Sequence, residues 1–218
     1  MRPALRLFAV AAVALLSACD PAGARDKAFP DPASDTADAR AKEDVAVFAG
    51  GCFWGVEAVF EHVRGVKSVV SGYAGGTRLT ARYPIVASGT TGHAEAVRVV
   101  YDPREVSYGQ LLKVFFAVAH DPTQLNRQGP DRGSQYRSQV FATSAAQQQA
   151  ARHYIATLDA AGVFKRPIVT RVEPLQAFYK AEPYHQDYLR RHPEEPYIVH
   201  HDLPKLAALE REFPDLWR

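Results

Sequence analysis

Sulfur-containing residues are scarce in this chain. Its 218 residues include 2 cysteines, Cys19 and Cys52, and one methionine, Met1. So few cysteines exclude a disulfide-stapled scaffold of the kind found in small secreted domains. Beyond the N-terminal region there is no long apolar run, no internal repeat and no block of basic residues. The composition therefore gives no reason to expect a nucleic-acid-binding protein.

The first 19 residues have the form of a secretory signal. Arg2 and Arg6 provide a basic start, an apolar run follows at 7–16, and small residues precede Cys19. This run is too short to cross a bilayer as a helix. The ending LSAC resembles a bacterial lipobox, which implies cleavage before Cys19 and acylation of its sulfur. We therefore predict an exported, periplasmic lipoprotein anchored to a membrane, with an ordinary secreted protein as the alternative.

Composition divides the chain into three regions. The signal peptide at 1–19 is followed by a stretch at 20–44 that is rich in Ala, Asp and Pro and has no apolar period. We expect this stretch to be a flexible tether. The remainder, 45–218, has the length of one domain. Because the signal contains two of the 26 basic side chains, the mature chain balances 24 basic against 24 acidic groups.

Helical and strand patterns interleave along the domain. Strands are predicted at 45–49, 66–73, 93–101, 139–143 and 168–173. Helices are predicted at 53–63, 107–119, 144–161, 184–191 and 206–212. Ser107 and Gln110 have the spacing of a capping box, and Gly162 closes the longest helix. This mixture favours an α+β protein, a two-layer α/β sandwich, over an all-α or all-β fold.

Cys52 lies between a pair of glycines and a predicted helix. The apolar run at 45–49 suits a buried strand, and Phe53 begins a segment with apolar residues at helical spacing. Cys52 is therefore expected at a helix N-terminus, where unpaired N–H groups and the helix dipole favour a thiolate. We predict a reactive cysteine. The alternative is a small, inert core residue.

Glu95 is the most informative acidic residue. In the predicted strand it shares the more apolar face with Val97, Val99 and Tyr101. Burial on that face should raise the pKa of the carboxyl, which would make it available as a general acid. The alternative is a carboxylate paired with an arginine.

Other candidate residues have less distinctive patterns. The polar loop at 126–138 is either mobile or held in place by function. Tyr83 and Tyr136 carry phenolic donors among turn residues, although each could be an ordinary surface or core tyrosine. Trp54 lies off the apolar stripe, so we expect an exposed indole beside the thiol, whereas Phe53 also fits the start of that stripe. The 8 histidines show no zinc-binding spacing, and we assign no metal site.

Six short motifs occur in the order GCFWG at 51–55, YAGG at 73–76, TGHAE at 91–95, HDPT at 120–123, the loop at 126–138 and YHQDY at 184–188. Together they resemble the motifs of A-type peptide methionine sulfoxide reductases. The resemblance implies a ferredoxin-like core with a mixed sheet inside the sandwich. It also implies reduction of methionine S-sulfoxide, free or in peptides, and so repair of oxidised proteins. No metal or organic cofactor is implied.

The resemblance also assigns roles position by position. The nucleophile, which becomes a sulfenic acid, is matched by Cys52. Phe53 and Trp54 match the pocket that holds the substrate methyl group. Glu95, Tyr83 and Tyr136 match the groups that hydrogen-bond and protonate the sulfoxide oxygen. Asp131 matches a polar residue that supports the site.

The sequence departs from many members of that family in one respect, because no cysteine follows Cys52. Those members use later cysteines to resolve the sulfenic acid as a disulfide. We therefore expect direct reduction by an external donor, a small thiol or a thioredoxin-like periplasmic protein. The other expected partners are oxidised proteins or peptides as substrates and a membrane contacted through the lipid anchor. We expect a monomer.

Two alternatives belong to other functional classes. A cysteine hydrolase would pair Cys52 with His93 or His185 and form an acyl-enzyme. A non-catalytic binding lipoprotein would still hold its ligand after a Cys52→Ser substitution and would turn nothing over.

Overall fold

The computed structural model describes residues 29–32 and 41–218. The predicted signal at 1–19, including Cys19, lies outside the described residues, as do 20–28 and 33–40 of the predicted tether. Within the described part, no helix is both long enough and apolar enough to span a bilayer.

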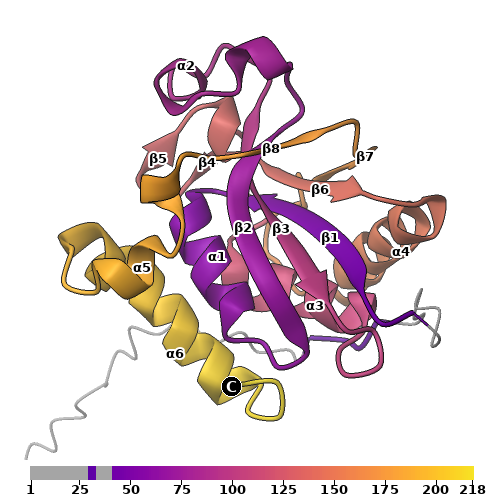
Figure 1. The fold of residues 1–218 in the computed structure, drawn as a ribbon. Helices are drawn as coiled ribbons and strands as arrows, with labels where there is room; N and C mark the ends of the chain where they lie inside the picture. Colours follow the sequence, from indigo (N-terminus) through magenta and orange to yellow (C-terminus); the bar gives the residue numbers. More distant parts are fainter. Residues whose placement is uncertain (1–28, 33–40) are drawn as a thin grey trace, which may run out of the picture.

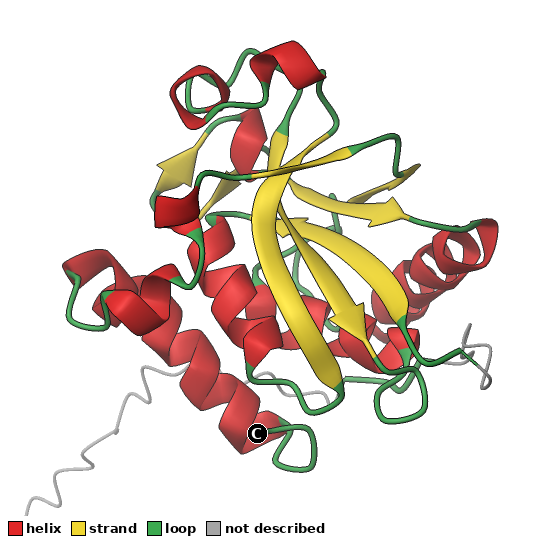
Figure 2. Ribbon diagram, in the orientation of Figure 1, coloured by secondary structure: helices red, strands yellow, loops and turns green. Residues whose placement is uncertain are grey.

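A six-stranded mixed sheet forms the centre of the fold (Figures 1 and 2). Its strands are β1 (Asp44–Gly50), β2 (Val66–Ala74), β3 (Ala94–Tyr101), β6 (Ser138–Ala142), β7 (Arg171–Pro174) and β8 (Phe178–Lys180). Their order is β7-β6-β1-β3-β2-β8, and every neighbouring pair is antiparallel except β6 and β7. A separate two-stranded hairpin consists of β4 (Arg127–Gln128) and β5 (Asp131–Arg132).

Helices pack around this sheet and give the molecule the predicted α+β class. The α-helices are α1 (Phe53–Glu61), α2 (Tyr83–Val86), α3 (Tyr108–Val114), α4 (Ala145–Ala161), α5 (Tyr188–Arg191) and α6 (Leu203–Glu212). The 3-10 segments are η1 (Arg78–Thr80), η3 (Ser134–Tyr136) and η4 (Pro183–His185). Two π-helical segments are η2 (Phe115–Ala119) and η5 (Ile198–Asp202).

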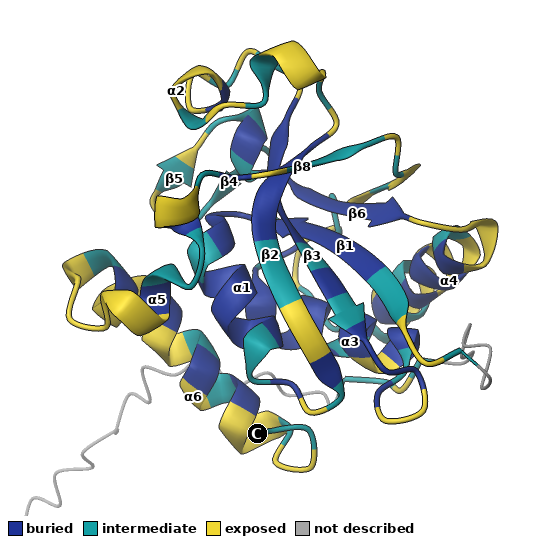
Figure 3. Cartoon of the chain, viewed as in Figure 1, coloured by how far each residue is buried: buried dark blue, intermediate teal, exposed yellow. Residues whose placement is uncertain are grey.

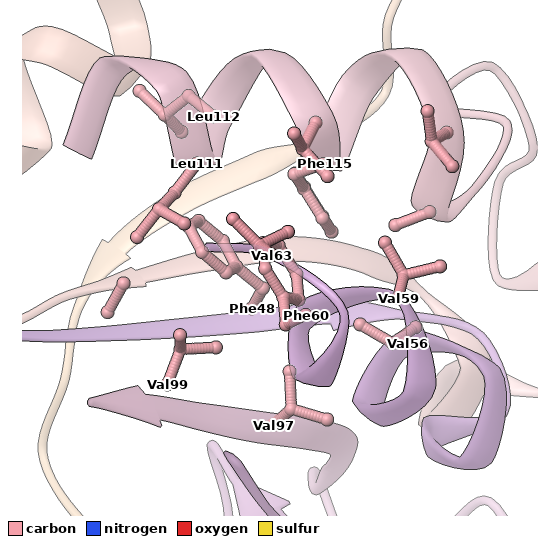
Figure 4. Close-up of a cluster of buried hydrophobic side chains, with 14 of the residues drawn as sticks. Phe48, Val56, Val59, Phe60, Val63, Val97, Val99, Leu111, Leu112 and Phe115 are labelled. Carbon is pink, nitrogen blue, oxygen red and sulfur yellow. The ribbon is translucent and has the colours of Figure 1, made fainter. Parts of the chain in front are cut away.

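The main core lies between the sheet and helices α1 and α3 (Figure 4). The ring of Phe48 in β1 stacks on Phe60 of α1 and on Phe115 of η2, with centroids 5.1 and 4.9 Å apart. Val97 and Val99 of β3 join the same core, as the face predicted for Glu95 requires. Each such side chain contributes about 1.5–3 kcal/mol when fully buried. The central strands are accordingly buried along most of their length (Figure 3).

Most predicted elements are present, and the differences have local causes. The helix predicted at 107–119 has its capping box at Ser107 and Gln110 but changes to the π-helical η2 after α3. There the ring Nδ1–H of His120 donates to the Phe115 carbonyl at 3.0 Å, so a side chain binds the helix end. The strand predicted at 168–173 begins later, as β7. The two- and three-residue strands β4, β5 and β8 were not predicted, because such short segments show no periodicity.

Residues 29–32 bind to the domain, which differs from the free tether that we predicted for 20–44. The Phe29 ring packs edge-on against Phe164 at a centroid distance of 5.7 Å. The Tyr154 hydroxyl of α4 donates to the carbonyl of Pro30 at 2.9 Å, and Lys113 of α3 contacts Asp31 at 2.7 Å. A partly buried aromatic ring and one buried hydroxyl thus fix a segment whose composition indicates disorder.

Candidate active site

Cys52 is the N-cap residue of α1, as the glycine–helix pattern predicts. The preceding Gly51 has a φ of +96°, and a Cβ there would lie 2.5 Å from the side chain of Gln128. The Gln128 amide donates to the Asp121 carbonyl at 3.0 Å and accepts from the Asp121 N–H at 3.2 Å. Gly51 therefore allows the loop at 126–138 to pack closely behind the cysteine.

The Cys52 thiol is buried, with only 8% of the residue exposed. Burial raises the pKa of this thiol well above its usual value, and the carboxylates of Glu95 and Asp202 raise it further. A hydrogen bond involving the Trp54 backbone lowers the pKa, but it is outweighed. Our prediction that the helix end produces a thiolate is therefore wrong for the free site. Desolvation is stronger than the helix dipole, and the resting group is a thiol.

Glu95 of β3 faces the same helix end. Its Oε2 accepts a hydrogen bond from the Phe53 backbone N–H at 3.1 Å, and only 2% of the residue is exposed. Burial raises the pKa of this carboxyl to about 8, against the opposing effect of the Phe53 hydrogen bond. The predicted upward shift is confirmed. The alternative arginine pair is absent, because Glu95 forms no ion pair with any residue in the described ranges.

Two phenols reach the site from separate segments. Tyr83 begins α2 and Tyr136 ends η3. The pKa of each hydroxyl is raised by burial first and by Glu95 second, so both stay protonated and can donate hydrogen bonds. The loop at 126–138, which carries Tyr136, contains β4, β5 and η3 and is held against α2 by Ser134, whose hydroxyl donates to the Gly89 carbonyl at 2.8 Å.

Phe53 and Trp54 form an aromatic wall beside the thiol. The Phe53 ring is 1% exposed and lies 4.9 Å from the His185 ring. The Trp54 indole stacks on Tyr188 with ring centroids 3.7 Å apart, and its Nε1–H donates to Nδ1 of His185 at 3.2 Å. The exposed indole that we predicted is therefore wrong, since α5 and η4 cover much of the Trp54 ring and fix its orientation.

Asp131 is held by a residue that sequence reasoning missed. The hydroxyl of Tyr197, just before η5, donates to Oδ2 of Asp131 at 2.5 Å. The Tyr197 ring also packs edge-on against Trp54 at a centroid distance of 6.0 Å. Tyr197 lies beyond the last recognisable motif, among turn residues without periodicity, so no sequence signal marks it.

A pocket of about 160 Å³ brings these groups together. It is lined by Cys52, Phe53, Trp54, Tyr83, Glu95, Asp131, Tyr136 and Tyr197. The thiol and the six side chains predicted around it therefore line one cavity, although they come from four separate segments of the chain, the last of them the loop at 126–138. The cavity is below the usual range for drug-sized ligands and suits a single side chain.

No histidine belongs to the wall of this pocket. The ring Nε2 of His93 contacts the Thr77 carbonyl at 3.0 Å, and His185 accepts from Trp54. The cysteine–histidine pair of a hydrolase is thus not formed by either candidate. Across the described ranges, no three His, Cys, Asp or Glu side chains are grouped so that they could hold a metal ion.

Comparison with known families identifies this constellation. The family model for peptide methionine sulfoxide reductase matches residues 44–216, which include every residue that lines the pocket. The chain belongs to the peptide methionine sulfoxide reductase family.

Named relatives place this reductase in the A-type branch. It is 54% identical over 193 residues to the peptide methionine sulfoxide reductase MsrA 2 of Synechocystis sp., covering 87% of this chain and 90% of the relative. It is 56% identical over 174 residues to the MsrA 2 of Mesorhizobium japonicum, covering 80% and 89%. The resemblance seen in the sequence is confirmed. The protein is a peptide-methionine (S)-S-oxide reductase, an oxidoreductase that repairs oxidised proteins.

Solved structures of the same family agree in fold. The reductase superposes on the reduced form of Mxr1 from Saccharomyces cerevisiae with a TM-score of 0.64 and 35% identity, covering 71% of this chain and 88% of that one. For methionine sulfoxide reductase A of Corynebacterium diphtheriae the TM-score is 0.62 and the identity 36%, covering 71% and 77%.

Glu182 is a second residue of the reductase that sequence reasoning missed. Its carboxylate accepts from the Tyr83 backbone N–H at 2.9 Å and from the Tyr73 hydroxyl at 2.8 Å. It thereby ties the start of α2, which carries a pocket phenol, to strand β2. Glu182 lies two residues before the YHQDY motif, but nothing in its sequence context indicates this bridging contact.

Proposed function

We propose that Cys52 reduces the sulfoxide directly. Its sulfur attacks the sulfoxide sulfur and forms an S–S bond. The S–O bond of the substrate and this S–S bond then break as the oxygen is transferred to the Cys52 sulfur, where a new S–O bond makes it the hydroxyl of a sulfenic acid. Methionine leaves with its sulfur reduced by the two electrons that the cysteine sulfur has lost. The observation that carries this proposal is a thiol and a carboxyl of raised pKa on the walls of one pocket the size of a side chain.

Glu95 acts as the proton donor and later as the acceptor. Its carboxyl, neutral below about pH 8, gives a proton to the sulfoxide oxygen and makes the sulfur electrophilic. The carboxylate left behind takes the proton of the Cys52 thiol, so the acid is restored when the sulfenic acid has formed. The raised pKa values of both groups support this role, because they keep both protons in the site at neutral pH.

The other pocket residues position the substrate. The methyl group lies against Phe53 and Trp54, which are apolar and held rigidly. Tyr83 and Tyr136 donate hydrogen bonds to the sulfoxide oxygen, and their protonated hydroxyls support this assignment. Asp131 supports the site through its hydrogen bond with a neighbouring tyrosine hydroxyl.

External thiols complete the cycle. A first thiol condenses with the Cys52 sulfenic acid to a mixed disulfide and releases water, and a second thiol restores the Cys52 thiol and leaves as part of a disulfide. The donor is a small thiol or a thioredoxin-like protein. The absence of any cysteine after Cys52 in the sequence supports this route over an internal disulfide.

We propose the same cellular setting that the N-terminal pattern predicts. The signal at 1–19 is removed, Cys19 is acylated, and residues 20–44 link a periplasmic domain at 45–218 to its lipid anchor. The lipobox-like ending supports the anchor, and the family match at 44–216 supports the domain. Within that domain we propose a ferredoxin-like core of β6-β1-β3-β2 with α1 and α3. The antiparallel order of these strands supports it.

A single turnover tests the proposed mechanism. The chain from residue 20 onwards, which lacks Cys19, is fully reduced, freed of reductant and mixed with a peptide containing methionine S-sulfoxide. We expect one methionine per protein and a single added oxygen on Cys52, both measured by mass spectrometry. The Cys52→Ser variant should form no methionine. Methionine formed without oxygen on Cys52 would contradict the proposed intermediate.

A further inference from the structure

Exposed apolar side chains gather on the segments that carry the pocket. In the described part of the chain, the exposed large hydrophobic residues are Leu79, Ile85, Leu125, Tyr184, Val199 and Leu203. Each lies within a few residues of a pocket residue or of the helices that cover Trp54. Leu79 and Leu125 are 87% and 62% exposed, so neither side chain belongs to the core. Figure 3 shows that α2 and β5 carry exposed and intermediate residues, in yellow and teal.

These segments are tied to one another around the pocket. The Gln135 amide donates to the Ala87 carbonyl at 3.1 Å, which joins the loop at 126–138 to the end of α2. The Tyr83 and His185 rings are 4.4 Å apart, which joins α2 to η4. The segments that carry the exposed apolar residues are therefore linked to one another around the pocket. We define the rim as the segments 77–90, 125–136, 182–188 and 197–203.

One half of the rim carries unpaired positive charge. The segments 77–90 and 125–136 contain Arg78, Arg82 and Arg132, all exposed and without an ion pair to any residue of the described ranges. Their only acidic residue, Asp131, lines the pocket and is bound by a tyrosine hydroxyl. In a mature chain with balanced charges, this half of the rim is a local excess of arginine.

We propose that the rim binds the polypeptide on either side of an oxidised methionine, with a preference for apolar segments that carry a carboxylate on one side. This rests on the reductase activity described above. The pocket of about 160 Å³ admits one side chain, so the neighbours of a peptide-bound methionine sulfoxide must lie across these segments. Apolar rim residues bury apolar neighbours, and Arg82 and Arg132, which adjoin Tyr83 and Asp131, attract an acidic one.

The arginines of the rim are confined to one half, whereas the segments 182–188 and 197–203 contain Glu182, Asp187 and Asp202. This distribution predicts an asymmetric preference. The opposite half, beyond Tyr197 and η4, has no such excess of arginine, and the exposed Glu194 and Glu195 precede it. A carboxylate on one side of the oxidised methionine should therefore help binding, and the same carboxylate on the other side should help less or hinder it.

Matched peptides test this inference on the full-length protein. The set comprises methionine S-sulfoxide in an apolar peptide with Asp, Asn or Lys two positions before or after it, and free methionine S-sulfoxide as the reference. Dithiothreitol serves as reductant, because in a ping-pong cycle kcat/KM for the sulfoxide does not depend on the thiol. On one side, Asp should exceed Lys by roughly five- to tenfold in kcat/KM at low salt, and 0.5 M NaCl should reduce this difference.

The double variant Arg82→Glu, Arg132→Glu should abolish or reverse that preference. Each variant's kcat/KM for a peptide is divided by its own value for free methionine S-sulfoxide, so that changes in folding or in the pocket cancel. Arg152→Glu, on the exposed side of α4, is the matched control and should keep the wild-type preference. Equal rates for the Asp and Lys peptides in the wild-type protein would overturn the proposal, as would an unchanged preference in the double variant.

A protein reductant must also reach Cys52, so it could bind the rim in place of the substrate peptide. The double variant Arg82→Glu, Arg132→Glu distinguishes these two binding partners. If the double variant changed only kcat/KM for a thioredoxin-like donor and left the peptide series unchanged, the rim would belong to the reductant and the proposal would be wrong. If the wild-type protein reduced neither the peptides nor free methionine S-sulfoxide, the reductase function itself would fail, together with everything that rests on it.

Discussion

Burial, more than any neighbouring charge, sets the protonation of Cys52 and Glu95, the two groups that we propose react. Cys52 lies at a helix N-terminus, where about 0.5 of a positive charge favours a thiolate. Desolvation nevertheless raises its pKa, and it raises that of Glu95 to about 8. Both groups therefore hold a proton at neutral pH. The proposed reaction needs a proton for the sulfoxide oxygen and a cysteine sulfur as the nucleophile. A protonated Glu95 can supply that proton, whereas a permanently ionised Glu95 beside a Cys52 thiolate could not.

We expect the Tyr197 hydroxyl to contribute to the reductase activity. In Tyr197→Phe, the Asp131 carboxylate loses the donor that holds it, and an under-bonded charge remains in the pocket wall. A hydrogen bond to a charged group is worth about 1.5–3 kcal/mol, so we expect kcat/KM for methionine S-sulfoxide to fall by roughly tenfold or more. Steady-state kinetics measures this. The matched control is Tyr179→Phe in β8, outside the pocket, which should stay within about twofold of wild type.

Residue-level prediction succeeded where a side chain belonged to a recognisable motif. Cys52 and Glu95 could be selected from strand and helix patterns alone. The phenols and the aromatic pair were only weak candidates on those patterns, and the family resemblance assigned their roles and added Asp131. Tyr197 and Glu182 could not be selected, because their contacts join segments far apart in the chain and leave no local signal. The thiolate prediction was wrong because the degree of burial at a helix end depends on distant loops.

At the scale of elements, the glycine-containing turn before α1 positions the thiol. Gly51 has a positive φ and leaves no space for a Cβ beside Gln128, so the chain can present Cys52 and still pack against the loop at 126–138. The same loop carries Asp131 and Tyr136 into the pocket. Contacts such as that of the Ser134 hydroxyl with the Gly89 carbonyl tie this long polar loop to the domain, in line with the alternative that 126–138 is held in place.

The segment at 29–32 should contribute to stability. The Phe29→Ala variant removes a ring that is partly buried against Phe164, and we expect unfolding free energy to fall by about 1–2 kcal/mol, less than for a fully buried phenylalanine. Urea unfolding of the full-length protein measures it. Asp31→Asn is the control, because that carboxylate is exposed and its removal should leave the unfolding midpoint close to wild type. An unchanged midpoint in Phe29→Ala would contradict the described contact.

At the scale of the whole molecule, the α+β class and the order of long elements were predictable. Apolar runs such as β1 and the amphipathic pattern of α4, with its Ser144 and Gly162 caps, have clear periodicity. The short strands β4, β5 and β8 were not predictable, because pairing with distant partners defines them. The binding of residues 29–32 was missed for the same reason. Tertiary contacts override a composition that indicates a tether.

The pH dependence of a single turnover, in the wild-type protein and in Glu95→Gln, tests the central claim most directly. Rapid mixing of the reduced protein with methionine S-sulfoxide measures the rate of methionine formation between pH 6 and 10. The wild-type rate should fall above about pH 8, where Glu95 loses its proton. The Glu95→Gln rate should be slower by roughly 100-fold or more, without a break near pH 8. A Glu95→Gln rate equal to wild type would contradict the assignment of Glu95 as the acid.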